Sequence, residues 1–219
     1  MSQETAAALA AIAEQVQVCK LCRLYQSATK GVPGAGNPNA EILFIGEGPG
    51  YYEDKSGLPF VGNSGKYLEK MLALIGLTRD DVFITNVVKH RPPENRDPLP
   101  DEIAACKPYL DQQLELIDPL VIATLGRHSM GRYFPNGKIT QIHGQPKYNG
   151  RHAYYPLYHP AAVLRNPSWQ EAMEADFKRL PEVLAKVKAL RNGAPPTSSG
   201  TPAAKKDEDD PPLKQLSMF

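Results

Sequence analysis

The chain has 219 residues, of which 42% are hydrophobic, and its 25 basic and 24 acidic residues leave a net charge of +1. This length suits one α/β domain with a tail, and the balanced charge gives no sign of a nucleic-acid binder, although a local basic stripe would suffice for one. The sequence carries no signal peptide and no transmembrane run, so we expect a cytoplasmic protein without membrane contact. Three cysteines, an odd number, argue against a disulfide framework and favour metal ligation or free thiols.

Helical patterns alternate with short apolar runs along residues 4–190. In chain order we expect helices at 4–17, 63–77, 99–117 and 168–190, the last with a bend at Pro181. Buried strands are expected within 41–50, 81–88, 119–126 and 152–160. The alternation predicts an α/β fold: a central four-stranded parallel sheet flanked by helices in three layers. In such folds, ligands bind in the loops at the carboxyl ends of the strands.

The composition changes after residue 191. Residues 192–212 are rich in proline, serine, alanine and charge, with almost nothing to bury, and we interpret them as a disordered linker. Apolar residues return in the last seven positions. We therefore expect one domain over 1–191, a linker over 192–212 and a short terminal peptide over 213–219.

Cys19 and Cys22 form a C-x-x-C pair whose thiolates can converge on one ion or cluster. The same spacing occurs in redox motifs, but the strand-to-helix context of the thioredoxin kind is absent here. Cys106 lies in the helix predicted at 99–117. Three thiolates need a fourth ligand, and His90 is the nearest candidate, although it could equally be an ordinary loop histidine. The spacing does not separate zinc from iron–sulfur.

Three motifs occur in one order along the chain: "GEGPGYYEDKSGLPFVG", "ITNVVKHRPPENRDPLPDE" and "YHPAAVLRNP". Together they resemble the family-4 uracil-DNA glycosylases, the iron–sulfur branch of that superfamily, over about Cys19 to Leu190. The resemblance implies a [4Fe–4S] cluster on Cys19, Cys22, His90 and Cys106, with His90 replacing the third family cysteine. A related group that bonds covalently to uracil carries a basic insertion after this histidine. The insertion is missing here, so covalent capture is not implied.

The resemblance also implies an enzyme that flips uracil out of DNA and hydrolyses its N-glycosidic bond, starting base excision repair. Phe60 would stack on the base, Asn86 would recognise its edge, and His159 would donate to O2 of the departing uracil. Tyr51 would form the pocket wall that excludes the thymine methyl group. The expected uracil-binding residues are Gly46, Gly48, Tyr51, Phe60, Asn86 and His159.

Glu47 is the expected water-activating group. Other superfamily branches place an Asp or Asn one residue further on, where this chain has Gly48, so Glu47 is the available carboxylate. Glu53 and Asp54 are further candidates nearby, although charged loop residues usually face solvent. The expected catalytic residues are therefore Glu47, Asn86 and His159.

The expected partners are uracil-containing DNA and the bacterial sliding clamp. We expect a monomer that is associated with the nucleoid. Lys89, Leu164 and Arg165 are expected DNA contacts, with Leu164 or Arg165 wedged into the duplex. Lys55, Lys66, Arg91 and Arg96 are further candidates for phosphate contacts. The terminal peptide Gln215–Phe219 resembles the segment that docks on the clamp. Two alternatives are a non-catalytic iron–sulfur module that recognises DNA damage and a zinc-stabilised nucleotide hydrolase.

Overall fold

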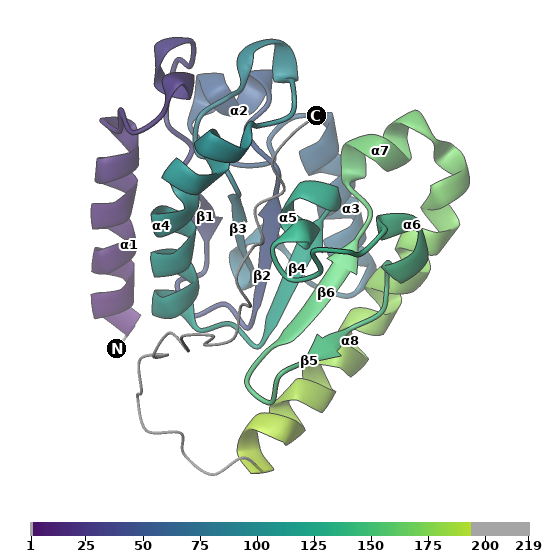
Figure 1. The fold of residues 1–219 in the computed structure, drawn as a ribbon. Helices are drawn as coiled ribbons and strands as arrows, with labels where there is room; N and C mark the ends of the chain where they lie inside the picture. Colours follow the sequence, from purple (N-terminus) through teal and green to yellow (C-terminus); the bar gives the residue numbers. More distant parts are fainter. Residues whose placement is uncertain (1, 194–219) are drawn as a thin grey trace, which may run out of the picture.

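Four parallel strands form the centre of the sheet in the computed structural model, which describes residues 2–193 (Figure 1). They lie side by side in the order β3-β2-β4-β6. Their bounds are β2 Ile42–Gly46, β3 Phe83–Asn86, β4 Val121–Leu125 and β6 Ala153–Leu157. Nearly every residue in them is buried, which explains why continuous apolar runs mark these strands in the sequence. The predicted four-stranded parallel centre is confirmed.

Two short edge strands, which the sequence did not reveal, extend this centre to six strands. β1 (Ala35–Gly36) pairs antiparallel with β3, and β5 (Lys147–Tyr148) pairs antiparallel with β6. Each has only two residues, too few to show a period of alternation. The sheet is therefore mixed, with antiparallel edges on a parallel core.

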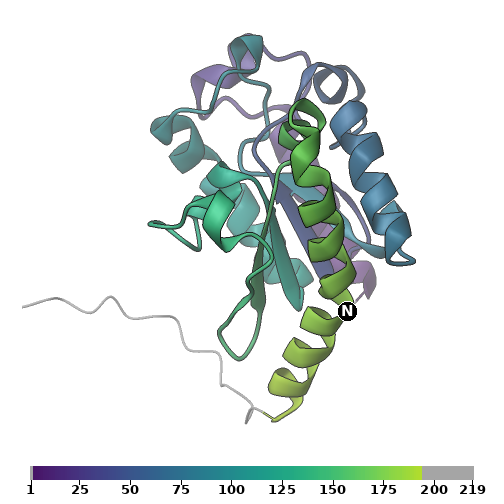
Figure 2. The same cartoon turned by 90° about the vertical axis from the view of Figure 1, so that its right-hand side faces the viewer.

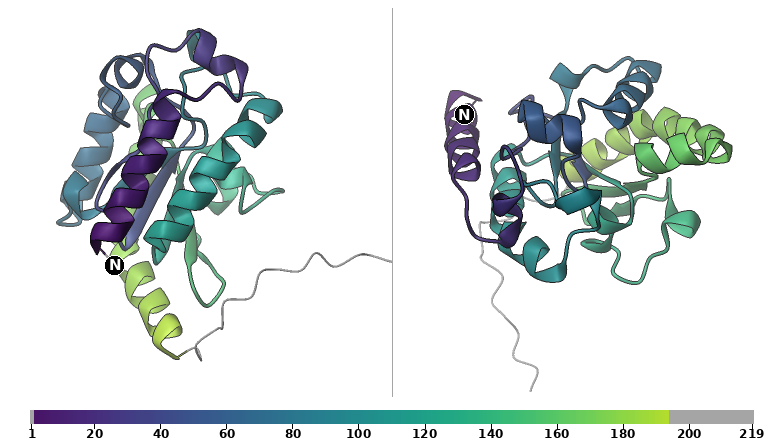
Figure 3. Two further views of the ribbon diagram at one scale, coloured as in Figure 1. Left: turned by 90° about the vertical axis from the view of Figure 1, so that its left-hand side faces the viewer. Right: turned by 90° about the horizontal axis from the view of Figure 1, so that it is seen from above.

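Helices cover both faces of the sheet, as predicted. α3 (Asn63–Leu74) and α8 (Gln170–Gly193) pack on one face, as Figure 2 shows. α1 (Ser2–Gln17) and α4 (Pro100–Ile117) pack on the other, as Figure 3 shows. Side chains of β2 alternate between the two resulting cores: Ile42 and Phe44 face the first, Leu43 and Ile45 the second.

Short helices and turns connect these elements, many of them beyond the carboxyl ends of the strands (Figure 1). The sequence patterns missed them because each is too short to show helical periodicity. The short α-helices are α2 (Tyr51–Ser56), α5 (Arg127–Gly131), α6 (Ile139–Ile142) and α7 (Pro160–Arg165). The 3-10 turns are η1 (Arg23–Gln26), η2 (Arg79–Asp81), η3 (Pro93–Asn95) and η4 (Pro167–Trp169).

α8 continues across Pro181 to Gly193. The first two residues of the predicted linker, 192 and 193, therefore belong to this helix. Residues 194–212 of the linker and the terminal peptide 213–219 lie outside the described residues. Within residues 2–193, no helix combines the length and apolarity needed to cross a membrane.

The turn at Phe60 packs directly against the first turn of α3. Phe60 has a φ of 51°, a left-handed conformation that is costly for an aromatic residue. Arg79 holds this turn by donating to the carbonyls of Phe60 (2.7 Å) and Pro59 (2.5 Å). Gly65 lies so close that an added Cβ would be 1.8 Å from the Phe60 oxygen. The glycine therefore permits the contact that orients Phe60.

We expect Gly65→Ala to lower the free energy of unfolding by about 3 kcal/mol, because the added methyl group meets a backbone carbonyl that has little room to move. Gly131→Ala is the matched control, since a Cβ added there meets no atom within 4 Å. Urea denaturation of both variants measures the difference. Equal stability of the two variants would contradict the predicted contact.

Candidate active site

A cleft of about 820 Å³ opens at the carboxyl edge of the parallel strands. Its size is that of a small-molecule site. The cleft therefore lies where the strand-end rule predicts a ligand site. The cleft is lined by residues that include Glu47, Gly48, Tyr51, Phe60, Asn86, His159 and Arg165.

Phe60 and Asn86, which line this cleft, meet at Gly46 at the end of β2. Gly46 pairs with Asn86 across the parallel β2–β3 ladder. A Cβ added to Gly46 would lie 2.3 Å from Asn86 Oδ1 and 2.6 Å from the Phe60 ring. Glycine is therefore required for the aromatic ring and the carboxamide to approach the same strand end. The structure brings together three of the predicted uracil-binding residues.

The Asn86 carboxamide has an unused acceptor. Asn86 is 1% exposed, and no residue among 2–193 donates a hydrogen bond to its Oδ1. A buried acceptor without a donor costs about 1–3 kcal/mol, so it is rarely left unpaired without a reason. The end of β3 thus presents a polar group that can accept a hydrogen bond from a bound ligand.

His159 lies two residues after β6, at the same carboxyl edge of the parallel strands as Asn86. Its ring centroid is 5.8 Å from that of Phe60, and Gly126 leaves room for it, since a Cβ there would be 3.0 Å from His159 Cβ. Burial lowers the pKa of His159 to about 4, helped by the positive charge of Arg165. The ring is therefore neutral at pH 7. Its Nδ1 accepts from the Ala161 amide (3.1 Å), which places the ring proton on Nε2.

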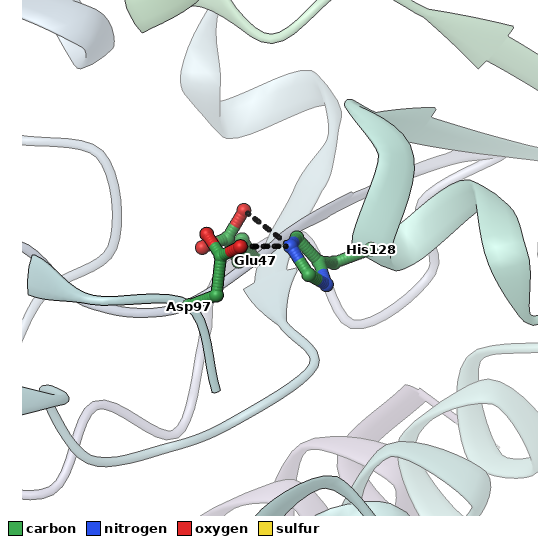
Figure 4. A group of neighbouring side chains, drawn as sticks. All are labelled: Glu47, Asp97 and His128. Atoms are coloured by element: carbon green, nitrogen blue, oxygen red, sulfur yellow. Dashed lines mark ion pairs between the residues drawn. The ribbon is translucent and has the colours of Figure 1, made fainter. Parts of the chain in front are cut away.

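Glu47 follows β2 and is the half-buried carboxylate expected at this edge. The pKa of Glu47 is raised, chiefly by burial and further by the negative charge of Asp97. The side chains of His128, Arg127 and Arg165 oppose this rise. His128 Nε2 is 3.7 Å from Glu47 Oε2. Figure 4 draws this ion pair as a dashed line. Sequence reasoning missed His128 and Asp97. The signal for His128 was its place just after a buried strand, the same position that singled out Asn86 and His159.

Glu53 and Asp54 are buried rather than solvated, which corrects the expectation from sequence. Glu53 accepts from the amides of Val61 and Gly62 (both 2.9 Å) and of Gly50 (3.1 Å). Asp54 is 2% exposed and accepts from the Thr29 amide at 2.7 Å. Their oxygens are used to hold loop backbone, so neither is a free acid or base for the cleft.

The three cysteines come together on the α1–α4 side of the sheet. All are free thiols, and Cys106 is buried. Burial raises the pKa of Cys106 to about 11, and the neighbouring thiols of Cys22 and Cys19 contribute in the same direction. The Lys89 amide donates to Cys106 Sγ at 3.2 Å. Arg23, which follows Cys22, pairs with Asp101 (2.7 Å) and so fixes the C-x-x-C segment to the start of α4.

His90 is buried and follows Lys89, whose amide contacts Cys106. It is 5% exposed, and no hydrogen bond to its ring occurs within the described part of the chain. Burial lowers its pKa, against the opposing charge of Asp54, so the neutral ring can act as a ligand. Its neighbour Lys89 contacts Cys106, which brings this segment against α4. Three sulfurs and one unprotonated imidazole are a suitable donor set for iron–sulfur ligation.

Lys89 is not a DNA contact, and that prediction was wrong. The side chain is 1% exposed, and burial lowers its pKa to about 7. Its Nζ donates to the Asn86 carbonyl (2.9 Å), Thr85 Oγ1 (2.6 Å) and Gln113 Oε1 (2.8 Å). β3 ends three residues earlier, and the chain bends over residues 87–90. The lysine thus joins the end of β3 to α4 instead of facing solvent.

Of the other predicted surface residues, Tyr51, Arg96 and Arg165 line the cleft. Leu164 and Tyr51 are about half exposed, at 47% and 53%. Arg165, at the end of α7, is exposed and also lines the cleft. Arg96 is partly taken up by Glu102, which it contacts through two hydrogen bonds of 2.8 and 2.7 Å.

A model of the uracil DNA glycosylase superfamily matches residues 33–185. The chain is 51% identical over 184 residues to a type-4 uracil-DNA glycosylase of Sulfurisphaera tokodaii, covering 78% of this chain and 83% of the relative. The chain belongs to the type-4 uracil-DNA glycosylases. A type-4 uracil-DNA glycosylase of Saccharolobus solfataricus is 47% identical, and the match covers 80% of this chain and 85% of the relative. One of Thermotoga maritima is 45% identical, and the match covers 72% of this chain and 83% of the relative.

In this type-4 glycosylase, the segment that matches the superfamily, residues 33–185, includes the strand-end and cleft residues from Gly46 to Arg165. It also includes His90 and Cys106. Cys19 and Cys22 precede it. The resemblance found in the sequence motifs is confirmed over most of the chain.

We expect Glu53→Gln to lower the free energy of unfolding by about 1.5–3 kcal/mol, because the carboxylate accepts three backbone hydrogen bonds and an amide group cannot accept all of them. The exposed Glu94→Gln is the control and should change stability little. Thermal unfolding followed by circular dichroism compares the two. A variant as stable as the wild type would show that the loop does not depend on this carboxylate.

Proposed function

We propose that this type-4 uracil-DNA glycosylase releases uracil from DNA by hydrolysing the N-glycosidic bond of deoxyuridine, leaving an abasic site for base excision repair. The observation that carries the assignment of roles is the unpaired, buried Oδ1 of Asn86 beside Phe60. A base can reach these two residues only after it has left the stack.

Asn86 would select uracil through its edge. Oδ1 would accept from uracil N3–H, and the amide would donate to O4. Cytosine presents the opposite pattern, which would leave polar groups unpaired on both partners. Phe60 would stack on the base, worth about 1–3 kcal/mol. The exposed ring of Tyr51 stands at the cleft wall, where it would exclude a C5 methyl group.

His159 would stabilise the leaving group. As the glycosidic bond breaks, its electron pair moves to uracil and negative charge develops on O2. The neutral ring carries its proton on Nε2 and can donate to that oxygen without giving the proton up. A neutral donor in a buried site stabilises developing charge and needs little rearrangement.

Glu47 would act on the sugar. The carbon left by uracil carries positive charge, which a carboxylate stabilises. A water molecule then adds to that carbon, and Glu47 accepts its proton, which completes the hydrolysis. Gly48 adds no side chain between this carboxylate and the cleft.

A non-catalytic damage-recognition module is the alternative function. It would need the base pocket but neither a leaving-group donor nor a carboxylate. The presence of His159 and Glu47 in the same cleft favours the enzyme.

Asn86→Asp should lower kcat/KM for uracil release by about 100-fold or more, because one carboxylate oxygen would face uracil O4 without a proton. The purified full chain and the variant are incubated with a uracil-containing oligonucleotide, and free uracil and alkali-labile sites are counted. Wild-type protein that binds the oligonucleotide without releasing uracil would overturn the enzyme in favour of the binding module.

We also propose a [4Fe–4S] cluster on Cys19, Cys22, His90 and Cys106. The family resemblance, the grouped free thiols and the buried neutral His90 support it. Imidazole in place of thiolate raises the potential of such clusters. The bound cluster would tie the segment before η1 to α4.

His90→Cys should keep the iron, whereas His90→Ala should weaken iron binding by about 10–100-fold or more, since a ligand is lost. Iron and acid-labile sulfide per chain, with the visible absorbance of the cluster, provide the measurement. Full iron content in His90→Ala would show that another group supplies the fourth ligand.

Arg165, which lines the cleft, and its half-exposed neighbour Leu164 support a role for α7 in holding the DNA, with one of them filling the space of the flipped base. Docking of Gln215–Phe219 on the sliding clamp stays a prediction from the sequence.

A further inference from the structure

Two tyrosines at the start of the short helix α2 are exposed at the cleft. Tyr51 and Tyr52 are 53% and 61% exposed, and both line the cleft. Their rings meet edge to face, with centroids 5.5 Å apart. α2 lies above the carboxyl edge of the parallel strands (Figure 1). Neighbouring aromatic rings left in solvent beside a cleft mark a surface that binds a partner, and the proposed reaction gives Tyr52 no role.

Two cations lie over the ring of Tyr51. Lys55 Nζ is 5.9 Å from the ring centroid, and Arg91 Cζ is 5.4 Å from it, close enough for cation–π attraction. Each cation is also held by a hydrogen bond. Lys55 Nζ donates to Thr29 Oγ1 at 3.1 Å, and Arg91 Nε donates to Asn95 Oδ1 at 2.8 Å. The two charges are therefore fixed side by side, one from α2 and one from the loop before η3.

No carboxylate within residues 2–193 forms an ion pair with either cation. Glu94, the carboxylate nearest to Arg91 along the chain, pairs with neither of them. Glu53 and Asp54, the carboxylates of α2, accept from loop amides instead. Arg96 at the same cleft, by contrast, is paired with a buried carboxylate. This surface therefore carries positive charge that an anionic ligand can neutralise.

We propose that the α2 face, made of Tyr51, Tyr52, Lys55 and Arg91, binds unpaired nucleotides of the strand that carries the flipped base. The two cations contact two phosphates, and the Tyr52 ring stacks on a base next to the flipped one. In a duplex, neighbouring bases cover the face on which such a ring would stack, so the ring favours single-stranded DNA. This inference deepens the proposed glycosylase function and rests on it.

The first test is the salt dependence of DNA binding by the full chain. The probe is a single-stranded oligonucleotide with thymine in place of uracil. Each phosphate contact on a single strand contributes about 0.7 to the slope of log K against log salt concentration. The double variant Lys55→Gln, Arg91→Gln should therefore bind more weakly, with a slope smaller by about 1.4. Iron content and thermal unfolding check that the segment around His90 is intact.

Lys186→Gln is the matched control for this test. Lys186 Nζ lies 4.7 Å from the centroid of the Tyr148 ring, so it forms the same kind of pair. Tyr148 is in β5 and pairs with Ala153 at the start of β6, at the edge of the sheet opposite the cleft. The slope of this variant should equal that of the wild type. A double variant with the wild-type slope would overturn the proposal.

The second test compares Tyr52→Ala with Tyr52→Phe. Loss of the ring should weaken binding of the single strand by about 5–100-fold and leave the salt slope unchanged, because the ring carries no charge. Tyr52→Phe keeps the ring and should keep the affinity. Binding of the duplex of the same sequence should be weakened less. The proposal fails if Tyr52→Ala binds the single strand as tightly as the wild type, or if it loses equal affinity for the duplex.

The thymine oligonucleotides require no excision, so these measurements do not depend on uracil release. If the variants behave as expected but the wild type releases no uracil, the proposed function alone is overturned. If the wild type releases uracil and all variants bind DNA like the wild type, this inference alone is overturned.

Discussion

The parallel pairing of β2 with β3 decides where the central side chains of the cleft lie. Its register places Gly46 opposite Asn86, and the ladder continues beyond the strands through Val87 to Gly46 (3.0 Å) and Val88 to Glu47 (3.1 Å). The carboxamide and the carboxylate are thus fixed relative to each other by backbone hydrogen bonds. A slip of one residue would turn Asn86 to the other face of the sheet.

The same strand end links the cleft to the thiol group on the far side of the sheet. The Lys89 ammonium donates to the Asn86 carbonyl, and its amide donates to Cys106. A lysine without a carboxylate partner is costly to bury, and three neutral acceptors offset that cost. The proposed base-recognition and cluster sites therefore share one short piece of backbone, and Lys89 contacts a member of each.

Long elements and strand-end residues could be predicted from the sequence, because burial on both sheet faces leaves continuous apolar runs. The motifs around Asn86 and His159 lie at the edge of the sheet where the cleft opens. Lys89 was misjudged because nothing in its neighbours shows that the chain turns inward. Asp97 and His128 were missed because their meeting depends on how a loop folds back over α5, which spacing along the chain does not encode. The burial of Glu53 likewise depends on amides that lie eight and nine residues away.

The three hydrogen bonds of Glu53 have a consequence for how a base is captured. They join the start of α2, the loop that follows it and the start of α3 into one rigid frame around Phe60. A frame formed before the ligand arrives loses little conformational entropy on binding, so the interaction energy of the base can go into discrimination. The flipped nucleotide would then bind without a change in protein conformation. The opening of the duplex, rather than the closing of the protein, would limit the rate of recognition.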